Sequence, residues 1–446
     1  MRYPWGTQIS ALLLGVFMPM GRTQSPPSAG NLPMTLDDAI RLAEANEPTF
    51  AAALAENRAV ALERKDAKAG LLPSVDFHNQ YLFTESNHTK SATSQGSPAQ
   101  SLPVFIANNA VHEYTSQGTV NETIGWAGVA TVKLADANAA RAEAELEIAR
   151  RGLMATVVEL YYSVRSGAEK LAVSVRALDE ANRFLDITEK RERAGEAAHA
   201  DVLKARLGQQ QRQREISDAG LANQKAALEL GVLLFPDPGT KYTVAEETAP
   251  PALPDLADVE AAARTNNPEL RSALATVQAG QAETQKAWAG LTPDLALNYS
   301  YGIDAPQFAS HGPDGVLNRG YSASATFDIP VWDWLTSERK VKEAHIRAEA
   351  SRVALTAVQR RLLANLTEFY NEAEVAQKQL ASLDASVTDA RESLRLTSLR
   401  YTNGESTVLE VVDAQNTLVM AENAQADGMV RYHVALAQLG TLTGRL

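Results

Sequence analysis

Residues 294–304 of this chain read DLALNYSYGID, an alternation of apolar and polar side chains that decides the fold. Successive side chains of a β-strand point to opposite faces, so this order predicts a strand with one apolar and one polar face. The stretch 320–330 alternates in the same way, with Tyr321 and Phe327 on its apolar face. The residues between them, 305–318, are polar and rich in glycine, which predicts a hairpin.

The hairpin is expected twice, because the chain is an internal tandem duplication. In the first part of each copy the matching positions are 220 residues apart: Leu36, Pro48, Gly70, Pro73 and Tyr81 recur as Leu256, Pro268, Gly290, Pro293 and Tyr301. Later matches are 209 residues apart, among them Arg191 with Arg400 and Gly195 with Gly404. The smaller offset indicates that the first copy carries extra residues in its loops.

Each copy is expected to contain a helix, a strand, a loop, a strand, a long helix, a tight turn and a helix. The first copy, 34–232, has helix 36–72, strands 74–84 and 118–127, and helices 130–193 and 198–232. The second copy, 256–442, has helix 256–291, strands 294–304 and 320–330, and helices 334–400 and 407–442. The proline-rich segment 235–254 is expected to connect the copies as part of an equatorial belt, with a short strand at 241–244.

The strand at 118–127 contains a conflict. If it is regular, Glu122 shares a face with Val120, Ile124 and Trp126. A β-bulge or a register shift would remove the carboxylate from the apolar face, so one of the two is expected there.

Alternation alone fits both a transmembrane β-barrel with a wet interior and an ordinary half-buried antiparallel sheet. Two features favour the barrel: aromatic residues gather at the strand ends, and no second sheet is expected that could cover the apolar faces. These aromatic residues are Tyr81, Trp126, Tyr301, Trp332 and Trp334.

The N-terminus is typical of a secretory signal peptide, assigned to residues 1–24 with an unclear cleavage site. Arg2 precedes an apolar run from Ile9 to Met20. Beyond it no stretch approaches eighteen uninterrupted apolar residues, so strands are expected to make any later membrane crossing. This combination predicts the cell outer membrane.

The composition argues against a nucleic-acid partner and against an enzyme. The net charge is −12 and the basic residues are interspersed with acidic ones, whereas phosphate backbones require clustered Lys and Arg. The chain has no cysteine, its seven histidines show no metal-ligand spacing, and no nucleotide-binding or hydrolase motif is present. No catalytic residue, metal or cofactor is expected.

Four strands cannot close a barrel, and an open edge in lipid leaves backbone groups without partners, so the chain is expected to oligomerise. Two copies give a barrel filled by side chains, while three give twelve strands and a passage, which the polar faces favour. The helix over 130–193 would be about 96 Å long, and the two shorter helices about 108 Å if stacked end to end. Stacking beside the long helix is therefore expected, with coiled-coil hairpins ending at Gly195 and Gly404.

Residues 400–414, RYTNGESTVLEVVDA, resemble the gate-region motif of the TolC-like outer membrane factors. Residues 191–205 resemble the same motif more weakly. The resemblance covers nearly all of the chain from 34 to 442. It implies a membrane α+β fold: a trimeric twelve-stranded β-barrel in outer-membrane lipid, four strands per chain, continuous with a long periplasmic α-helical barrel of coiled-coil hairpins.

The function implied by the resemblance is the outer-membrane exit duct of a tripartite efflux or type I secretion system. Such a passive channel opens when a periplasmic adaptor, or membrane fusion protein, and an inner-membrane pump of the RND, ABC or MFS type dock. The alternative is a periplasmic coiled-coil adaptor or scaffold protein without a channel. It shares the helices but would not need two alternating hairpins.

Glu410 and Asp413 are three residues apart, which places them on one helix face just past the turn. By resemblance they form the acidic constriction of the periplasmic entrance, where six carboxylates of a trimer would favour cations. Two solvated acids on an exposed helix are the alternative. Their counterparts in the first copy are Asp201 and Lys204, so only the first of the two positions is negatively charged in both copies.

Tyr401 matches a gate tyrosine that holds the entrance helices closed through hydrogen bonds, although its heptad position equally predicts packing. Ser406 stands where some family members carry an arginine, which puts that particular latch in doubt. Gly195 and Gly404 are expected to take positive φ. By resemblance they form, with Glu196 and Glu405, the tip turns that contact the adaptor, although turn chemistry alone explains the glycines.

Overall fold

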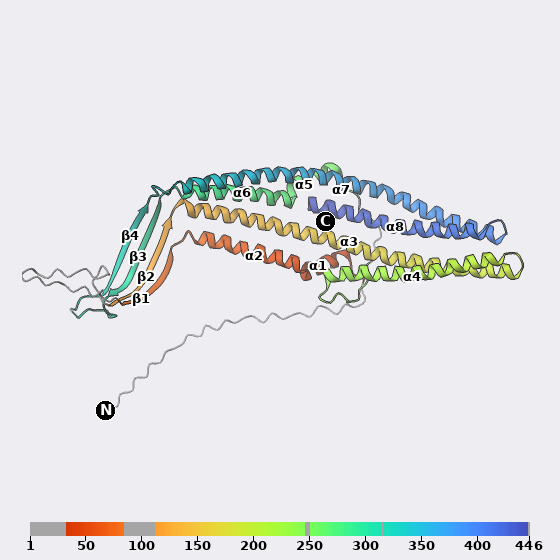
Figure 1. The fold of residues 1–446 in the computed structure, drawn as a ribbon, viewed down its shortest axis with the longest axis horizontal. Helices are drawn as coiled ribbons and strands as arrows, with labels where there is room; N and C mark the ends of the chain where they lie inside the picture. The colour runs from red at the N-terminus through yellow and green to blue at the C-terminus, as the bar shows by residue number, and fades with distance from the viewer. Residues whose placement is uncertain (1–32, 84–111, 246–249, 314, 445–446) are drawn as a thin grey trace, which may run out of the picture.

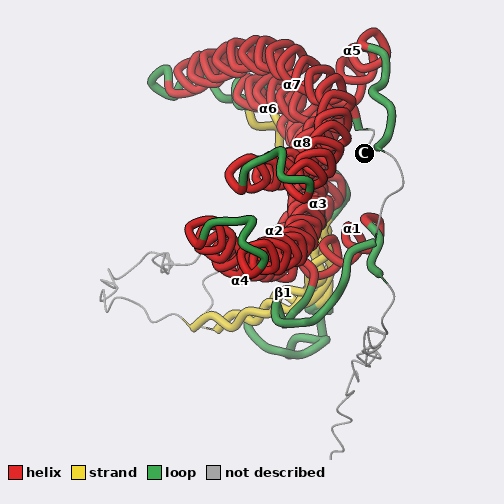
Figure 2. The backbone as a smooth tube through the Cα atoms, turned by 90° about the vertical axis from the view of Figure 1, so that its right-hand side faces the viewer, coloured by secondary structure: helices red, strands yellow, loops and turns green. Residues whose placement is uncertain are grey.

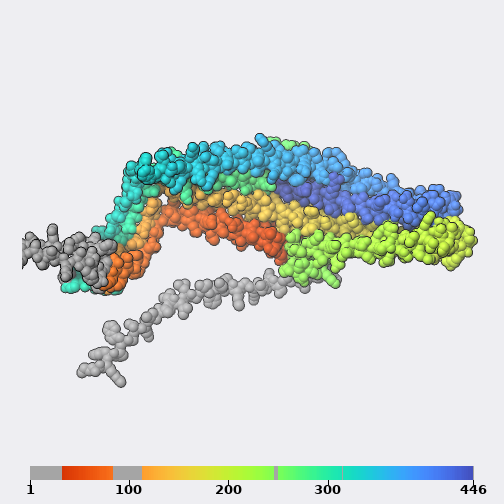
Figure 3. All heavy atoms as spheres, in the orientation of Figure 1, coloured from red at the N-terminus to blue at the C-terminus, as the bar shows by residue number. Residues whose placement is uncertain are grey.

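The computed structural model describes residues 33–83, 112–245, 250–313 and 315–444. They form an elongated body with a β-sheet at one end and two helical hairpin tips at the other (Figures 1 and 3). The expected signal peptide lies outside the described residues. The elements are α1 Leu36–Asn46, α2 Pro48–Ala69, β1 Ser74–Phe83, β2 His112–Ile124, α3 Trp126–Arg193, α4 His199–Leu234, α5 Leu256–Asn266, α6 Pro268–Ala289, β3 Asp294–Ala305, β4 Arg319–Asp328, α7 Thr336–Thr402 and α8 Val408–Thr443.

The first helix of each copy is two helices, so the single helices expected over 36–72 and 256–291 are wrong. Proline lacks an N–H and disfavours helical backbone in the residue before it. Glu47 accordingly has ψ 120°, and its carboxylate accepts a 2.6 Å hydrogen bond from the N–H of Phe50, which caps α2. In the second copy Asn267 caps α6 in the same way.

The four strands form one antiparallel sheet in the order β1-β2-β3-β4. One face is mainly apolar, and it carries Val75, Phe77, Tyr81 and Phe83; Tyr114 and Val120; Leu295, Leu297, Tyr299 and Tyr301; and Tyr321, Ala323, Ala325 and Phe327. Its polar members are Glu122 and the hydrogen-bonded pair Asn79 and Ser116. The opposite face carries Asp76, His78 and Gln80; Thr115, Gln117, Thr119 and Asn121; Asn298 and Ser300; and Ser322, Ser324 and Thr326. Val75, Phe77, Tyr321 and Phe327 are 61–75% exposed, so the apolar face is bare in the single chain.

The conflict at Glu122 is not removed by the backbone. β2 starts earlier than expected, and Trp126 is the first residue of α3 rather than the end of a strand. The β2–β3 register runs without interruption from Tyr114–Ala305 to Ile124–Leu295, so the expected bulge or register shift is wrong. Glu122 pairs with Leu297 of β3, one residue beyond the last pair of the β1–β2 ladder, Ser74–Asn121. A bulge there would break hydrogen bonds of the β2–β3 ladder to reorient one side chain.

The long helices form the framework of the wall, and the shorter helices stack beside them. α2 and α4 pack along successive parts of α3, and α6 and α8 lie between α3 and α7 (Figure 1). Viewed along the long axis the helices follow an arc, with α1 and α5 on its outer side (Figure 2). No helix in the described part of the chain is long and apolar enough to span a membrane.

The segment that connects the copies lies beside α1. The strand expected at 241–244 is a single parallel bridge between Met34 and Val244. The Tyr161 hydroxyl of α3 contacts the carbonyls of Met34 at 3.1 Å and Ala245 at 3.3 Å, and Tyr432 of α8 donates to the carbonyl of Pro251 at 2.7 Å. Side chains of both copies thus fasten the connecting segment to the middle of the wall.

A buried carboxylate holds α8 between the two long helices. Glu422 is 8% exposed, and its two oxygens contact Nη2 of Arg391 on α7 at 2.9 Å and Nη2 of Arg176 on α3 at 3.4 Å. Both arginine side chains are more than half exposed, so water screens part of this attraction. The carboxylate itself is largely shielded from solvent and depends on the two guanidinium groups.

Glu422→Ala is expected to lower the free energy of unfolding by about 1–2 kcal/mol, because it removes the charge shared by three helices. The midpoint of thermal unfolding, followed by circular dichroism in detergent, should fall. The matched control is Glu349→Ala, which removes an exposed ion pair with Arg352 within α7. Equal midpoints for the two variants would contradict this role of Glu422.

Candidate functional site

The two hairpin tips are built alike. Gly195 has φ 79° and Gly404 has φ 82°, as expected for helix ends that close with a left-handed residue. In each turn the N–H of the next glutamate donates at 2.8 Å to the carbonyl five residues earlier, Glu196 to Arg191 and Glu405 to Arg400. The two turns therefore keep the backbone geometry of a common ancestor, and their side chains distinguish them.

Tyr401 lies between the hairpins and is 4% exposed. Its ring packs against Phe184 of α3 with centroids 5.0 Å apart, and its hydroxyl donates to Oγ1 of the buried Thr188 at 3.3 Å. Val408 and Val411, from the start of α8, complete this small apolar cluster. Within one chain the Tyr401 side chain therefore both packs in this cluster and donates a hydrogen bond.

Arg191 is a second contact between the hairpins. Its guanidinium lies 4.9 Å from the centroid of the Tyr401 ring, and its Nη1 donates to the backbone carbonyl of the same residue. That carbonyl is in the last turn of α7, where the helix dipole favours a cation. Nε of Arg191 also lies 3.5 Å from the Glu196 carboxylate. Arg191 thus joins the end of one hairpin to the end of the other.

The sequence did not predict Thr188 and Arg191 as partners of Tyr401. Arg191 was recognisable only as the counterpart of Arg400 in the duplication. A repeat indicates which residues are equivalent, but it does not indicate which helix of one hairpin touches the next. That information comes from packing alone.

Glu410 is fully exposed in the first turn of α8, and two hydroxyls hold its carboxylate. Ser406 Oγ donates to Oε2 at 2.6 Å, and Thr407 Oγ1 donates to Oε1 at 3.2 Å. The Ser406 hydrogen bond is the main cause that lowers the pKa of Glu410 below its usual 4.5. The Ser406 hydroxyl therefore extends the range in which Glu410 is ionised to lower pH.

Asp413 and Asp201 are the other acids expected at the entrance. Asp413 is exposed and lines a groove of 600 Å³ between α3, α4 and α8. In the same groove the buried Arg212 donates to Glu215 at 2.6 Å and to Asn416. Asp201, in the first turn of α4, is half-buried. The described residues contain no group of three or more His, Asp or Glu suited to a metal ion.

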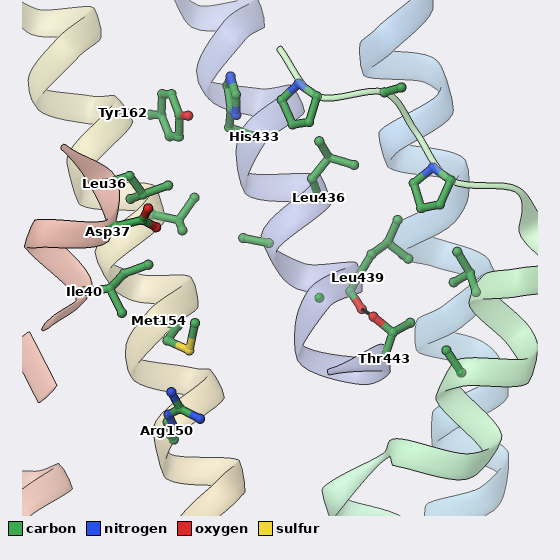
Figure 4. Close-up of a pocket in the computed structure, with 18 of the residues that line it drawn as sticks. Leu36, Asp37, Ile40, Arg150, Met154, Tyr162, His433, Leu436, Leu439 and Thr443 are labelled. Carbon is green, nitrogen blue, oxygen red and sulfur yellow. Dashed lines mark hydrogen bonds between the residues drawn. The ribbon is translucent and has the colours of Figure 1, made fainter. Parts of the chain in front are cut away.

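A cavity of 520 Å³ lies at mid-length of the wall, where α1, α3, α5 and α8 meet residues 251–254 (Figure 4). The rings of Tyr162 and His433 stack in it with centroids 3.7 Å apart. Leu36 and Leu439 provide apolar lining, and Arg150 extends into the same region. The stacked pair joins α3 of one copy to α8 of the other, so we assign this region to the joint between the copies.

Comparisons with known proteins agree with this architecture. A family model described as "Outer membrane efflux protein" matches residues 39–234 and 261–445, which confirms the resemblance noted above. OprJ of Pseudomonas aeruginosa is 23% identical over 316 residues, covering 69% of this chain and 63% of OprJ. TolC of Vibrio cholerae is 22% identical over 415 residues, covering 91% and 89%. The structure of the Campylobacter jejuni CmeC outer membrane channel has a TM-score of 0.76 at 15% identity, covering 92% and 85%.

Arg191→Ala is expected to loosen the tips, because it removes both the carbonyl contact and the ring contact with Tyr401. Amide hydrogen exchange at 399–405, measured by mass spectrometry, should become about tenfold faster. Arg193→Ala is the matched control, since Arg193 is exposed and, among the described residues, its side chain hydrogen-bonds only to the carbonyl of Glu189 in its own helix. Unchanged exchange in Arg191→Ala would show that Arg191 does not hold the tip.

Proposed function

Because the chain belongs to the outer membrane efflux protein family, we propose that three copies form the exit duct of a tripartite efflux or type I secretion system. The protein is an outer-membrane protein with a large periplasmic helical portion. The observation that carries the proposal is the sheet, whose bare apolar face and polar opposite face suit a barrel wall between lipid and water. The helical wall continues from that sheet to the tips (Figure 1).

The trimer is supported by two features of the single chain: its unpaired strand edges and the exposed apolar side chains of its outermost helices. Among the described strands, β1 and β4 each pair on one side only, and an unpaired edge inside lipid is costly. Along the helical wall, apolar side chains are exposed on the outermost helices, such as Leu207 and Leu221 on α4 and Val353 and Leu363 on α7. Three copies would close twelve strands and cover these faces.

The duplication specifies a contact between neighbouring copies. Within one chain Arg191 contacts Tyr401. A shift of 209 residues converts Arg191 into Arg400 and Tyr401 into Glu192, so a quasi-sixfold ring places Arg400 against Glu192 of the partner subunit. The charges are opposite and both groups reach solvent in the single chain, which favours an ion pair at that boundary.

This contact can be tested by disulfide formation, because the chain contains no cysteine. Arg400→Cys combined with Glu192→Cys should give covalently linked subunits on oxidation in outer-membrane fractions. Arg400→Cys with Glu180→Cys, about three turns away along α3, should not. A soluble monomer would overturn the duct, whereas a trimer without cross-linking would overturn only the quasi-sixfold contact.

At the periplasmic end we assign the entrance to Glu410 and Asp413 of the three copies, with Tyr401 and Asp201 beside it. Gly195, Glu196, Gly404 and Glu405 form the turns that would meet a periplasmic adaptor, which links the duct to a pump of the RND, ABC or MFS type. The alternative, an adaptor or scaffold without a channel, does not explain the exposed apolar face of the four-stranded sheet. The likeness to outer-membrane channels also favours the duct.

Cation selectivity in planar bilayers is expected to fall several-fold in the double variant Glu410→Ala with Asp413→Ala, because it removes six carboxylates from the entrance. Since the Ser406 hydrogen bond depresses the pKa of Glu410, the wild type should keep its selectivity to lower pH than Ser406→Ala. In Ser406→Ala that pKa rises, so the loss should begin at higher pH. Glu374→Ala, an exposed acid on α7 paired with Lys378, is the control. Unchanged selectivity in the double variant would exclude these acids from the constriction.

A further inference from the structure

Glu122 is an acid on the apolar face of the sheet. It lies in the register between Val120 and Ile124, and its neighbour across the ladder on β3 is Leu297. One carboxylate oxygen, Oε2, is buried and accepts no hydrogen bond from the described residues. An ionised group at such a position is costly, and it is expected to have a partner.

The surface around Glu122 is hollowed into a shallow groove of 520 Å³. On β4 its floor is formed by Ala323 and Ala325, which lie between the larger rings of Tyr321 and Phe327. On β3 its lining residues are Leu297, Asn298 and Tyr299, and Val120, Glu122, Pro73 and Ser324 complete it. The groove is thus mainly apolar and carries one carboxylate, the arrangement that fits an acyl chain with a cationic head group.

The described residues supply no cation at this place. Glu122 has no ion pair with any of them, and the ladder puts Leu297 beside it on β3 and Ala325 beyond on β4. In the proposed barrel a partner subunit would pair with β1 or β4, and strands are about 4.8 Å apart. The nearest strand of a partner subunit would therefore lie about 10 Å from β2 or farther.

The depth of Glu122 also favours a lipid head group. It is two residues from the end of β2 that leads into α3, about 7 Å along the strand. Trp126 follows and is 67% exposed, at the level where tryptophan marks the interface between hydrocarbon and head groups. The carboxylate thus sits close to the polar boundary of the leaflet on the periplasmic side.

We propose that this groove binds a phospholipid with a primary ammonium head group, namely phosphatidylethanolamine, whose ammonium donates to Glu122 while one acyl chain lies over Ala323 and Ala325. The inference rests on the proposed function, since it requires the apolar face to meet lipid. A carboxylate attracts the ammonium and repels an anionic head group. An anionic phospholipid is therefore disfavoured in the same groove.

Native mass spectrometry of the detergent-purified protein provides the test, with phosphatidylethanolamine and phosphatidylglycerol of identical acyl chains as probes. The wild type should retain phosphatidylethanolamine about tenfold better than phosphatidylglycerol. Glu122→Gln should abolish that preference. The matched control is Glu113→Gln, which removes an acid from the opposite face of the same strand and should preserve it.

A second variant tests the groove without touching the charge. Ala325→Phe fills the floor and should reduce retention of both lipids. Equal retention of phosphatidylethanolamine by the wild type and Glu122→Gln, or equal retention of the two lipids by the wild type, would overturn the proposal. The same spectra report the subunit number, so a trimer without lipid preference would reject the lipid site alone, and a monomer would reject the duct.

Discussion

The constraint on which this structure depends is the pairing of backbone groups in a solvent that offers no hydrogen bonds. A four-stranded sheet in lipid has two edges, and each unpaired N–H or C=O on them costs several kcal/mol by general estimates, about as much as a buried polar group without a partner. The proposed trimer satisfies these groups by adding strands on both sides. The helices follow an arc as well, because the short helices stack beside the long ones to form a wall (Figure 2).

The duplication makes the two hairpins similar, but the contact between hairpins within a chain differs from the proposed contact between chains. Within a chain, Arg191 meets an aromatic ring and a backbone carbonyl, and Tyr401 is buried in an apolar cluster. Salt screens such a contact little. The equivalent contact between copies would join Arg400 to a carboxylate at an exposed position, where screening is strong. In the proposed trimer the two hairpins of one chain should therefore move together, and separation should begin between chains.

The alternation of side chains and the spacing of the repeats were enough to predict the order of the elements, the polarity of both sheet faces and the positive φ of Gly195 and Gly404. Two features were missed: the break in the first helix of each copy and the contacts between the hairpins. The helix break at Pro48 is a local effect that the restriction on the residue before a proline could have predicted. The partners of Tyr401 depend on which hairpin faces meet, and no periodicity encodes that.

Glu122 shows how a mistaken expectation can be informative. The pattern required either a backbone defect or a polar group on the apolar face, and the expectation favoured the defect because an unpaired acid in lipid is costly. The structure keeps both ladders intact, which means that the pairing of many backbone groups outweighs the placement of one side chain. Residues that violate the rules of a fold tend to serve function rather than stability. At this position the violation lies in a groove of the right shape for a lipid, so the cost of the carboxylate can be offset by a partner that comes from the membrane itself.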